Sequence, residues 1–149
     1  MALLTLEVVT YREAGEILAL VRDFETCALP RERWTHAAHL TVALWYLLQY
    51  EWPEAVRRVR EGIKRLNEAH GVVTTRERGY HETLTLFWLR HVRAFLERGY
   101  NEARPLVPLA NELIERSDRN RPLEHYTRAL LFSWEARLGW VEPDIKPLD

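Results

Sequence analysis

Hydrophobic residues recur along most of the chain at intervals of three and four, which is the spacing of one face of an α-helix. In the segment 53–70, for example, Val56, Val59, Ile63 and Leu66 fall on a single helical face. No stretch alternates strictly between apolar and polar residues, as a half-buried β-strand would. The pattern therefore predicts an all-α protein.

Six segments carry this helical pattern, and proline and glycine residues mark many of the breaks between them. The predicted helices cover residues 11–26, 36–50, 53–70, 80–98, 107–117 and 122–139. Because the connections are mostly short, consecutive helices should run antiparallel. The sequence therefore predicts an up-and-down helical bundle of five to six helices.

The length of 149 residues suits one domain with a sizeable core. No repeat, low-complexity tract or linker divides the chain. We expect a single helical-bundle domain over residues 1–140, followed by an extended, proline-rich tail over residues 141–149.

Charge and composition exclude several classes of function. A formal net charge of −1 argues against binding that depends on nucleic acid phosphates or acidic membrane surfaces. No apolar run reaches the roughly 18 residues needed to cross a bilayer. The N-terminus lacks the basic start of a signal peptide. Cys27 is the single cysteine, so no internal disulfide can form, and a cytoplasmic location is the simplest interpretation.

The helix predicted over 36–50 is apolar nearly all round, because Trp45 lies opposite the face that carries His36, His39 and Leu47. Such a helix is either central in its bundle or faces another subunit. A homodimer is therefore one of two interpretations at this point.

Most histidines fall at the ends of predicted helices. His36 and His39 begin the second helix, and His81 begins the fourth. In an up-and-down bundle these two helices are parallel, so their N-termini share one end of the molecule. The first and third helices arrive at the same end with Glu25 and His70. The sixth helix should start there with His125, which leaves only His91 elsewhere.

Imidazoles with a carboxylate are the usual ligands of zinc, iron, nickel or copper. His36 and His39 are three residues apart, so both rings can approach one ion. His81 would supply a third ligand, and Glu25 or Glu82 a carboxylate. The sequence thus predicts a metal-binding bundle, and an open coordination position would suit a small-molecule hydrolase, isomerase or oxygenase.

Three further residues are candidates for catalysis at this end of the bundle. Glu82 could supply a carboxylate partner, and Tyr80 and Tyr126 could donate hydrogen bonds to a substrate. His70 and His125 are alternatives that could join the site or serve as ordinary residues of helix ends.

Two other interpretations remain open, because a pair of histidines three residues apart recurs by chance. The first is a non-catalytic interaction or dimerisation protein whose histidines are structural. The second is a metal-free site in which a histidine acts as a general base with tyrosine or glutamate partners. That site would require a pocket at the histidine end of the bundle.

Overall fold

The computed structural model describes residues 11–148, which form helices and connecting loops with no strand among them. The prediction of an all-α helical bundle is therefore confirmed. A short 3-10 helix, η2 (Arg31–Arg33), precedes the second helix. The five longer helices are α1 (Ala14–Glu25), α2 (His36–Gln49), α3 (Trp52–Ala69), α4 (Glu82–Gly99) and α5 (Leu106–Glu115).

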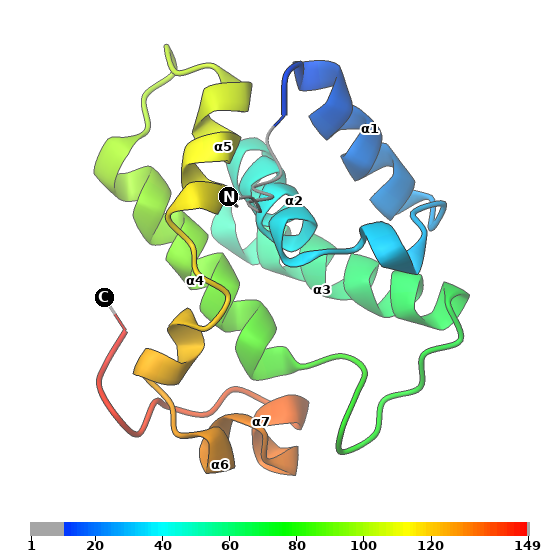
Figure 1. Cartoon of the computed structure of the whole chain (residues 1–149), viewed down its shortest axis with the longest axis vertical. Coiled ribbons are helices and arrows are strands. Elements are labelled where there is room, and N and C mark those ends of the chain that lie inside the picture. The colour runs from blue at the N-terminus through cyan, green and yellow to red at the C-terminus, as the bar shows by residue number, and fades with distance from the viewer. Residues whose placement is uncertain (1–10, 149) are drawn as a thin grey trace, which may run out of the picture.

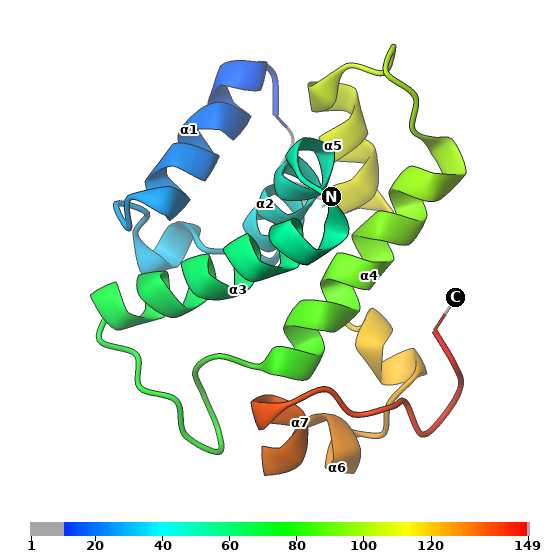
Figure 2. The same cartoon turned by 180° about the vertical axis from the view of Figure 1, so that it is seen from behind.

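Helix α2 lies at the centre of the bundle, where it contacts α1, α3, α4 and α5 (Figure 1). Figure 2 shows the bundle from behind, with α3 crossing α2. This position explains why α2 is apolar nearly all round, because each side of it packs against another helix of the same chain. A central position in the bundle is therefore sufficient to explain the apolar surface of α2. The homodimer stays a prediction.

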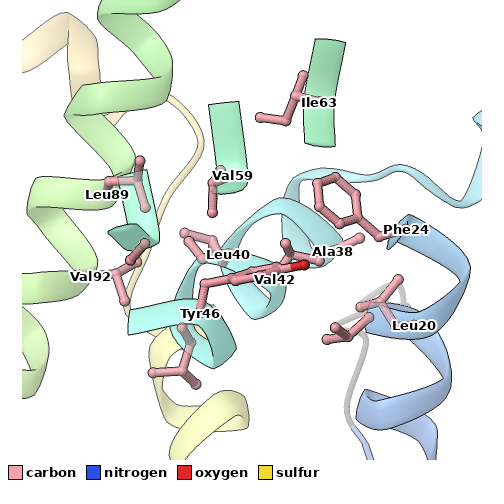
Figure 3. Close-up of a cluster of buried hydrophobic side chains, with 14 of the residues drawn as sticks. Leu20, Phe24, Ala38, Leu40, Val42, Tyr46, Val59, Ile63, Leu89 and Val92 are labelled. Carbon is pink, nitrogen blue, oxygen red and sulfur yellow. The ribbon is translucent and has the colours of Figure 1, made fainter. Parts of the chain in front are cut away.

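The hydrophobic core joins side chains from α1 to α5 (Figure 3). Phe24 of α1 and Leu40 of α2 are fully buried there, as is Val92 of α4. Each such side chain contributes about 1.5–3 kcal/mol by leaving water. The periodic apolar stripes in the sequence therefore supply the main driving force for this part of the fold.

Local capping explains where the helices begin. The hydroxyl of Thr35 accepts a hydrogen bond from the backbone N–H of Ala38 at 3.2 Å, so α2 starts at the predicted place. Pro105 stands just before α5, and Pro108 lies in its first turn. An N–H in the first turn has no partner within the helix, so Pro108 costs no hydrogen bond there.

The predicted continuous helix over 122–139 is wrong. The chain forms three short elements instead, namely η3 (Arg121–Glu124), α6 (Arg128–Leu131) and α7 (Trp134–Leu138). Thr127 and Ser133 interrupt the helix with extended backbone, and their side chains accept hydrogen bonds from Leu130 and Ala136. Each of these two residues caps a new helix rather than continuing the old one.

The proline-rich tail contains no helix from 141 to 148, and it folds back along η3 and α6 (Figure 1). The hydroxyl of Tyr126 donates to the carbonyl of Val141 at 2.7 Å, and Nδ1 of His125 donates to that of Pro147 at 3.0 Å. Residues 1–10 of the predicted domain and Asp149 of the predicted tail lie outside the described residues. Between 11 and 148, no helix is long and apolar enough to cross a membrane.

Candidate functional site

A cleft of about 680 Å³ opens where the helical bundle meets the C-terminal segment, by which we mean residues 117–148. Its walls come from η2 and the start of α2, the end of α3, and the first half of α4. The loop between α3 and α4 and the residues from 119 to 132 complete the walls. This volume lies within the range of about 300–1,000 Å³ that is common for small-molecule sites.

Four of the six histidines line this cleft: His36, His39, His70 and His81. The structure therefore brings together the starts of α2 and α4 and the end of α3, three of the helix ends that the sequence analysis placed at one end of the bundle. His91 and His125 line a separate and much smaller cavity of about 30 Å³. His125 thus lies apart from the predicted cluster, because the helix expected to start with it is replaced by η3 and a turn.

Three of the cleft histidines hold a distant segment in place through Nε2, the ring nitrogen farther from the backbone. Each donates to a backbone carbonyl: His36 to Ser117, His70 to Leu29 and His81 to Leu131, at 2.8, 2.7 and 2.7 Å. Because a carbonyl oxygen only accepts, the hydrogen of each ring is on Nε2. These bonds tie α2, α3 and α4 to loops and to the C-terminal segment.

His81 has no ring nitrogen left for chemistry. Its Nδ1 accepts a hydrogen bond from the backbone N–H of Leu84 at 3.1 Å, which makes this side chain the N-cap of α4. Its Nε2 is occupied by the carbonyl of Leu131. Burial lowers the pKa of His81, so the ring is neutral at pH 7. The residue predicted to be a third metal ligand therefore has a structural task.

His39 is arranged in the opposite way from the other three. Its Nδ1, the nitrogen nearer the backbone, donates to the carbonyl of Thr35 at 2.7 Å. The ring stacks on Trp34, with 3.8 Å between the two ring centres. Burial lowers the pKa of His39 to about 4, so the imidazole is neutral near pH 7. Its outer nitrogen, Nε2, therefore carries a lone pair that can accept a hydrogen bond or a proton.

The two predicted carboxylates do not line the cleft. Glu25 accepts a hydrogen bond from the hydroxyl of Tyr46 at 2.5 Å. Glu82 accepts two hydrogen bonds from Arg60, at 3.0 and 2.6 Å, and one from Tyr80 at 2.6 Å. Burial opposes ionisation of Glu82, but the hydrogen bonds from Arg60 and Tyr80 outweigh it and lower the pKa. Both acids are thus engaged in holding helices together.

The two predicted tyrosines also have structural partners. Tyr80 lines the cleft, but its hydroxyl is committed to Glu82, and burial raises the pKa of Tyr80. Tyr126 is fully buried away from the cleft and donates to Val141. Burial also raises the pKa of Tyr126, to about 12. Neither hydroxyl is therefore free to donate to a substrate in this arrangement.

Within residues 11–148, no group of three or more histidine, cysteine, aspartate or glutamate side chains is placed to share a metal ion. His36, His39, His81 and Glu25 therefore gain no support as a ligand set. Binding of zinc, iron, nickel or copper stays a prediction.

The charged residues that line the cleft are arginines. Arg31, Arg78, Arg119 and Arg128 line it, whereas none of its described lining residues is acidic. None of the four forms an ion pair with the described part of the chain, in contrast to Arg57, Arg60 and Arg104, which pair with glutamates. The chain as a whole carries a net charge of −1, so the positive charge here is a local concentration. This arrangement attracts anions.

The rest of the lining includes aromatic side chains and asparagine residues. Trp34 and Trp88 lie in the walls, and His36 packs edge-on against Trp88 with 4.8 Å between ring centres. The side-chain amides of Asn67 and Asn120 also line the cleft, and neither is hydrogen-bonded to another described residue. A ligand that combines a ring, a negative charge and polar edges would find partners for each part.

Sequence reasoning located the histidines but missed the arginines. Arg31, Arg78, Arg119 and Arg128 lie in loops, turns or a short helix, where no periodic pattern assigns a direction to a side chain. The one indication in the sequence is that the segments that carry these arginines adjoin the helix ends that carry the histidines. The chain matches no family model, no curated protein and no solved structure.

Proposed function

We propose that the protein binds a small organic anion with an aromatic ring in the cleft between the bundle and the C-terminal segment. The observation that carries this proposal is the charge of the lining, which has four arginines that form no ion pair within residues 11–148 and no acidic side chain among its described residues. Arginine suits carboxylate and phosphate groups because its planar guanidinium can form two parallel hydrogen bonds with them.

The aromatic lining supports the second half of the proposal. Trp34 stacks on Phe24, at 5.2 Å, and on His39, at 3.8 Å, so its orientation is fixed before a ligand arrives. Trp88 is held in contact with both His36 and Phe87. Rigid aromatic walls lose little conformational entropy on binding, so they favour a flat ligand over a flexible one.

The test compares ligands that share a ring and differ in charge. Phenyl phosphate and benzoate are the anionic probes, benzamide is neutral, and benzylamine is cationic. We expect the two anions to raise the melting temperature and the amide and amine to leave it unchanged. A ligand at tenfold its dissociation constant stabilises the folded state by about 1.4 kcal/mol. Equal stabilisation by benzylamine and by the anions would contradict the proposal.

Paired arginine variants locate the binding. Arg119→Gln with Arg128→Gln removes two charges from the cleft, whereas Arg22→Gln with Arg65→Gln removes two charges from exposed positions outside it. Both double variants change the net charge equally. We expect titration calorimetry to show at least a tenfold loss of phenyl phosphate affinity in the first, since a charged hydrogen bond contributes about 1.5–3 kcal/mol. An equal loss in both would place the binding elsewhere.

A further inference from the structure

The four histidines of the cleft differ in which ring nitrogen they leave unoccupied. His36, His70 and His81 all use the outer nitrogen, Nε2, to hold a carbonyl of another segment. His39 instead uses the inner nitrogen, Nδ1, on the carbonyl of Thr35 within its own helix cap. Among these four residues, His39 alone presents an outer nitrogen that no described group occupies.

In the neutral ring of His39, Nε2 is a hydrogen-bond acceptor and not a donor. The hydrogen of His39 is held on Nδ1 by Thr35, so Nε2 carries the lone pair. The stack on Trp34, with planes 29° apart, fixes the ring as well. The side chain thus offers an acceptor in a defined position, in a cleft whose charged lining residues are arginines, which only donate.

We propose that Nε2 of His39 accepts a hydrogen bond from an O–H or N–H group of the ligand, and that the ligand is therefore an aromatic acid carrying such a donor. This inference rests on the proposed function and makes it more specific. The arginines bind the acidic group, the tryptophans contact the ring, and His39 selects hydroxylated or aminated rings over unsubstituted ones. A hydroxybenzoate is the simplest molecule with all three features.

The test uses pairs of probes that differ only in the donor. The 2-, 3- and 4-hydroxybenzoates are each compared with the methoxybenzoate of the same position, which keeps an oxygen but has no hydrogen to donate. We expect at least one hydroxybenzoate to bind about three- to tenfold more tightly than its methoxy partner, the range of one net hydrogen bond. Benzoate is the reference without either group.

The matched variants are His39→Phe and His70→Phe. His39→Phe keeps a ring against Trp34 but removes the acceptor, so each hydroxybenzoate and its methoxy partner should bind with equal affinity in this variant. His70 lines the same cleft with its outer nitrogen occupied by Leu29, so His70→Phe should keep the preference. A preference that persists in His39→Phe would overturn the assignment.

A measurement on the unaltered protein provides the same test if either variant fails to fold. Nitrogen NMR distinguishes the two tautomers, and His39 should show its hydrogen on Nδ1 and an Nε2 resonance that shifts when a hydroxybenzoate binds. A hydrogen on Nε2 would overturn the inference. Benzoates that bind with no hydroxyl preference at any position would overturn it and leave the proposed function intact. If phenyl phosphate and the benzoates all fail to bind, the inference about His39 and the proposed function are both overturned.

Discussion

The helical core, formed by α1 to α5, and the C-terminal segment hold together in different ways. The core is an extended apolar cluster in which fully buried residues such as Leu44 and Leu66 come from neighbouring helices. The C-terminal segment contributes Tyr126 and Leu131 to a smaller cluster, in which they join Phe87 of α4. Hydrogen bonds from side chains to backbone carbonyls add to this apolar cluster. Apolar burial stabilises the first region, whereas individually directed hydrogen bonds define the second.

Hydrogen bonds join the two regions, and some of the residues that form them line the cleft. Nε2 of His81 donates a hydrogen bond to the carbonyl of Leu131, and the hydroxyl of Thr83 donates one to the carbonyl of Gly139. In the other direction, Arg137 of α7 donates to the carbonyl of Gly79, in the loop before α4, at 2.9 Å. The cleft is therefore bounded on one side by the helical core and on the other by a segment held through polar contacts and a small apolar cluster. Changes in the two regions should have different consequences.

The largest effect is expected from opening a cavity in the core. Leu44 lies in the central helix and is fully buried, so Leu44→Ala should lower the free energy of unfolding by about 2–5 kcal/mol. Because α2 contacts four helices, both regions should unfold at one lower urea concentration, monitored by tryptophan fluorescence and circular dichroism. Leu138→Ala, at a position 60% exposed, is the control and should change little. Separate transitions for the two regions would contradict this interpretation.

The next effect comes from His39, on the core side of the cleft. Its pKa in the folded protein is about 4 because of burial, below the value of roughly 6.5 for an unfolded histidine. The unfolded chain therefore binds the proton first, and stability falls as the pH decreases from about 6.5 to 4. We expect a loss of roughly 1–3 kcal/mol from this residue. Urea unfolding at pH 7 and pH 4 should show that His39→Phe loses less free energy of unfolding between these two pH values than the unaltered chain does. Equal losses in the two proteins would contradict this assignment to His39.

These two regions also differ in how far the sequence predicts them. Stripes such as Val56, Val59 and Ile63 fix one helix face, so the helices and the shared end of His36 and His81 followed from periodicity. The sequence pattern did not predict which ring nitrogen of each histidine forms a hydrogen bond, because most of these bonds go to carbonyls that are distant in sequence. His36 and Ser117, for example, are 81 residues apart.

The C-terminal segment was predicted least well for the same physical reason. Thr127 and Ser133 resemble ordinary helix residues in a periodic pattern, yet both act as caps. A hydroxyl can bond within a helix or begin a new one, and tertiary contacts decide between the two outcomes. The arginines of the cleft lie in such irregular segments, so their convergence was not predictable either.

An effect of similar size, but confined to one region, is expected from Thr83. This residue is fully buried in the first turn of α4, and its hydroxyl donates to Gly139 at 2.7 Å and accepts from the N–H of Val141 at 3.2 Å. Thr83→Val keeps the shape and removes both bonds, which should cost about 1–3 kcal/mol. Amide hydrogen exchange should accelerate in residues 134–148 and stay unchanged in α1 to α3.

The control for this substitution is Thr85→Val on the same helix. The hydroxyl of Thr85 donates to the carbonyl of His81 and does not reach the C-terminal segment. Hydrogen exchange in 134–148 should therefore remain slow in Thr85→Val. Uniform acceleration across the whole chain in Thr83→Val would show that the C-terminal segment is not a separately loosened unit.

The smallest effect concerns the tail alone. Asp144 accepts hydrogen bonds from the N–H and the hydroxyl of Thr127, at 2.8 and 2.7 Å, and these bonds lower the pKa of Asp144. A carboxylate whose pKa is lower in the folded state stabilises it above the unfolded pKa, and this contribution is lost as the pH falls through the folded value. The amide resonance of Ile145, whose N–H donates to His125, should therefore shift towards a loosened state below about pH 4. Asp144→Asn should remove that pH dependence, whereas Asp23→Asn on α1 should preserve it. A transition that survives in Asp144→Asn would mean that another group holds the tail against η3 and α6.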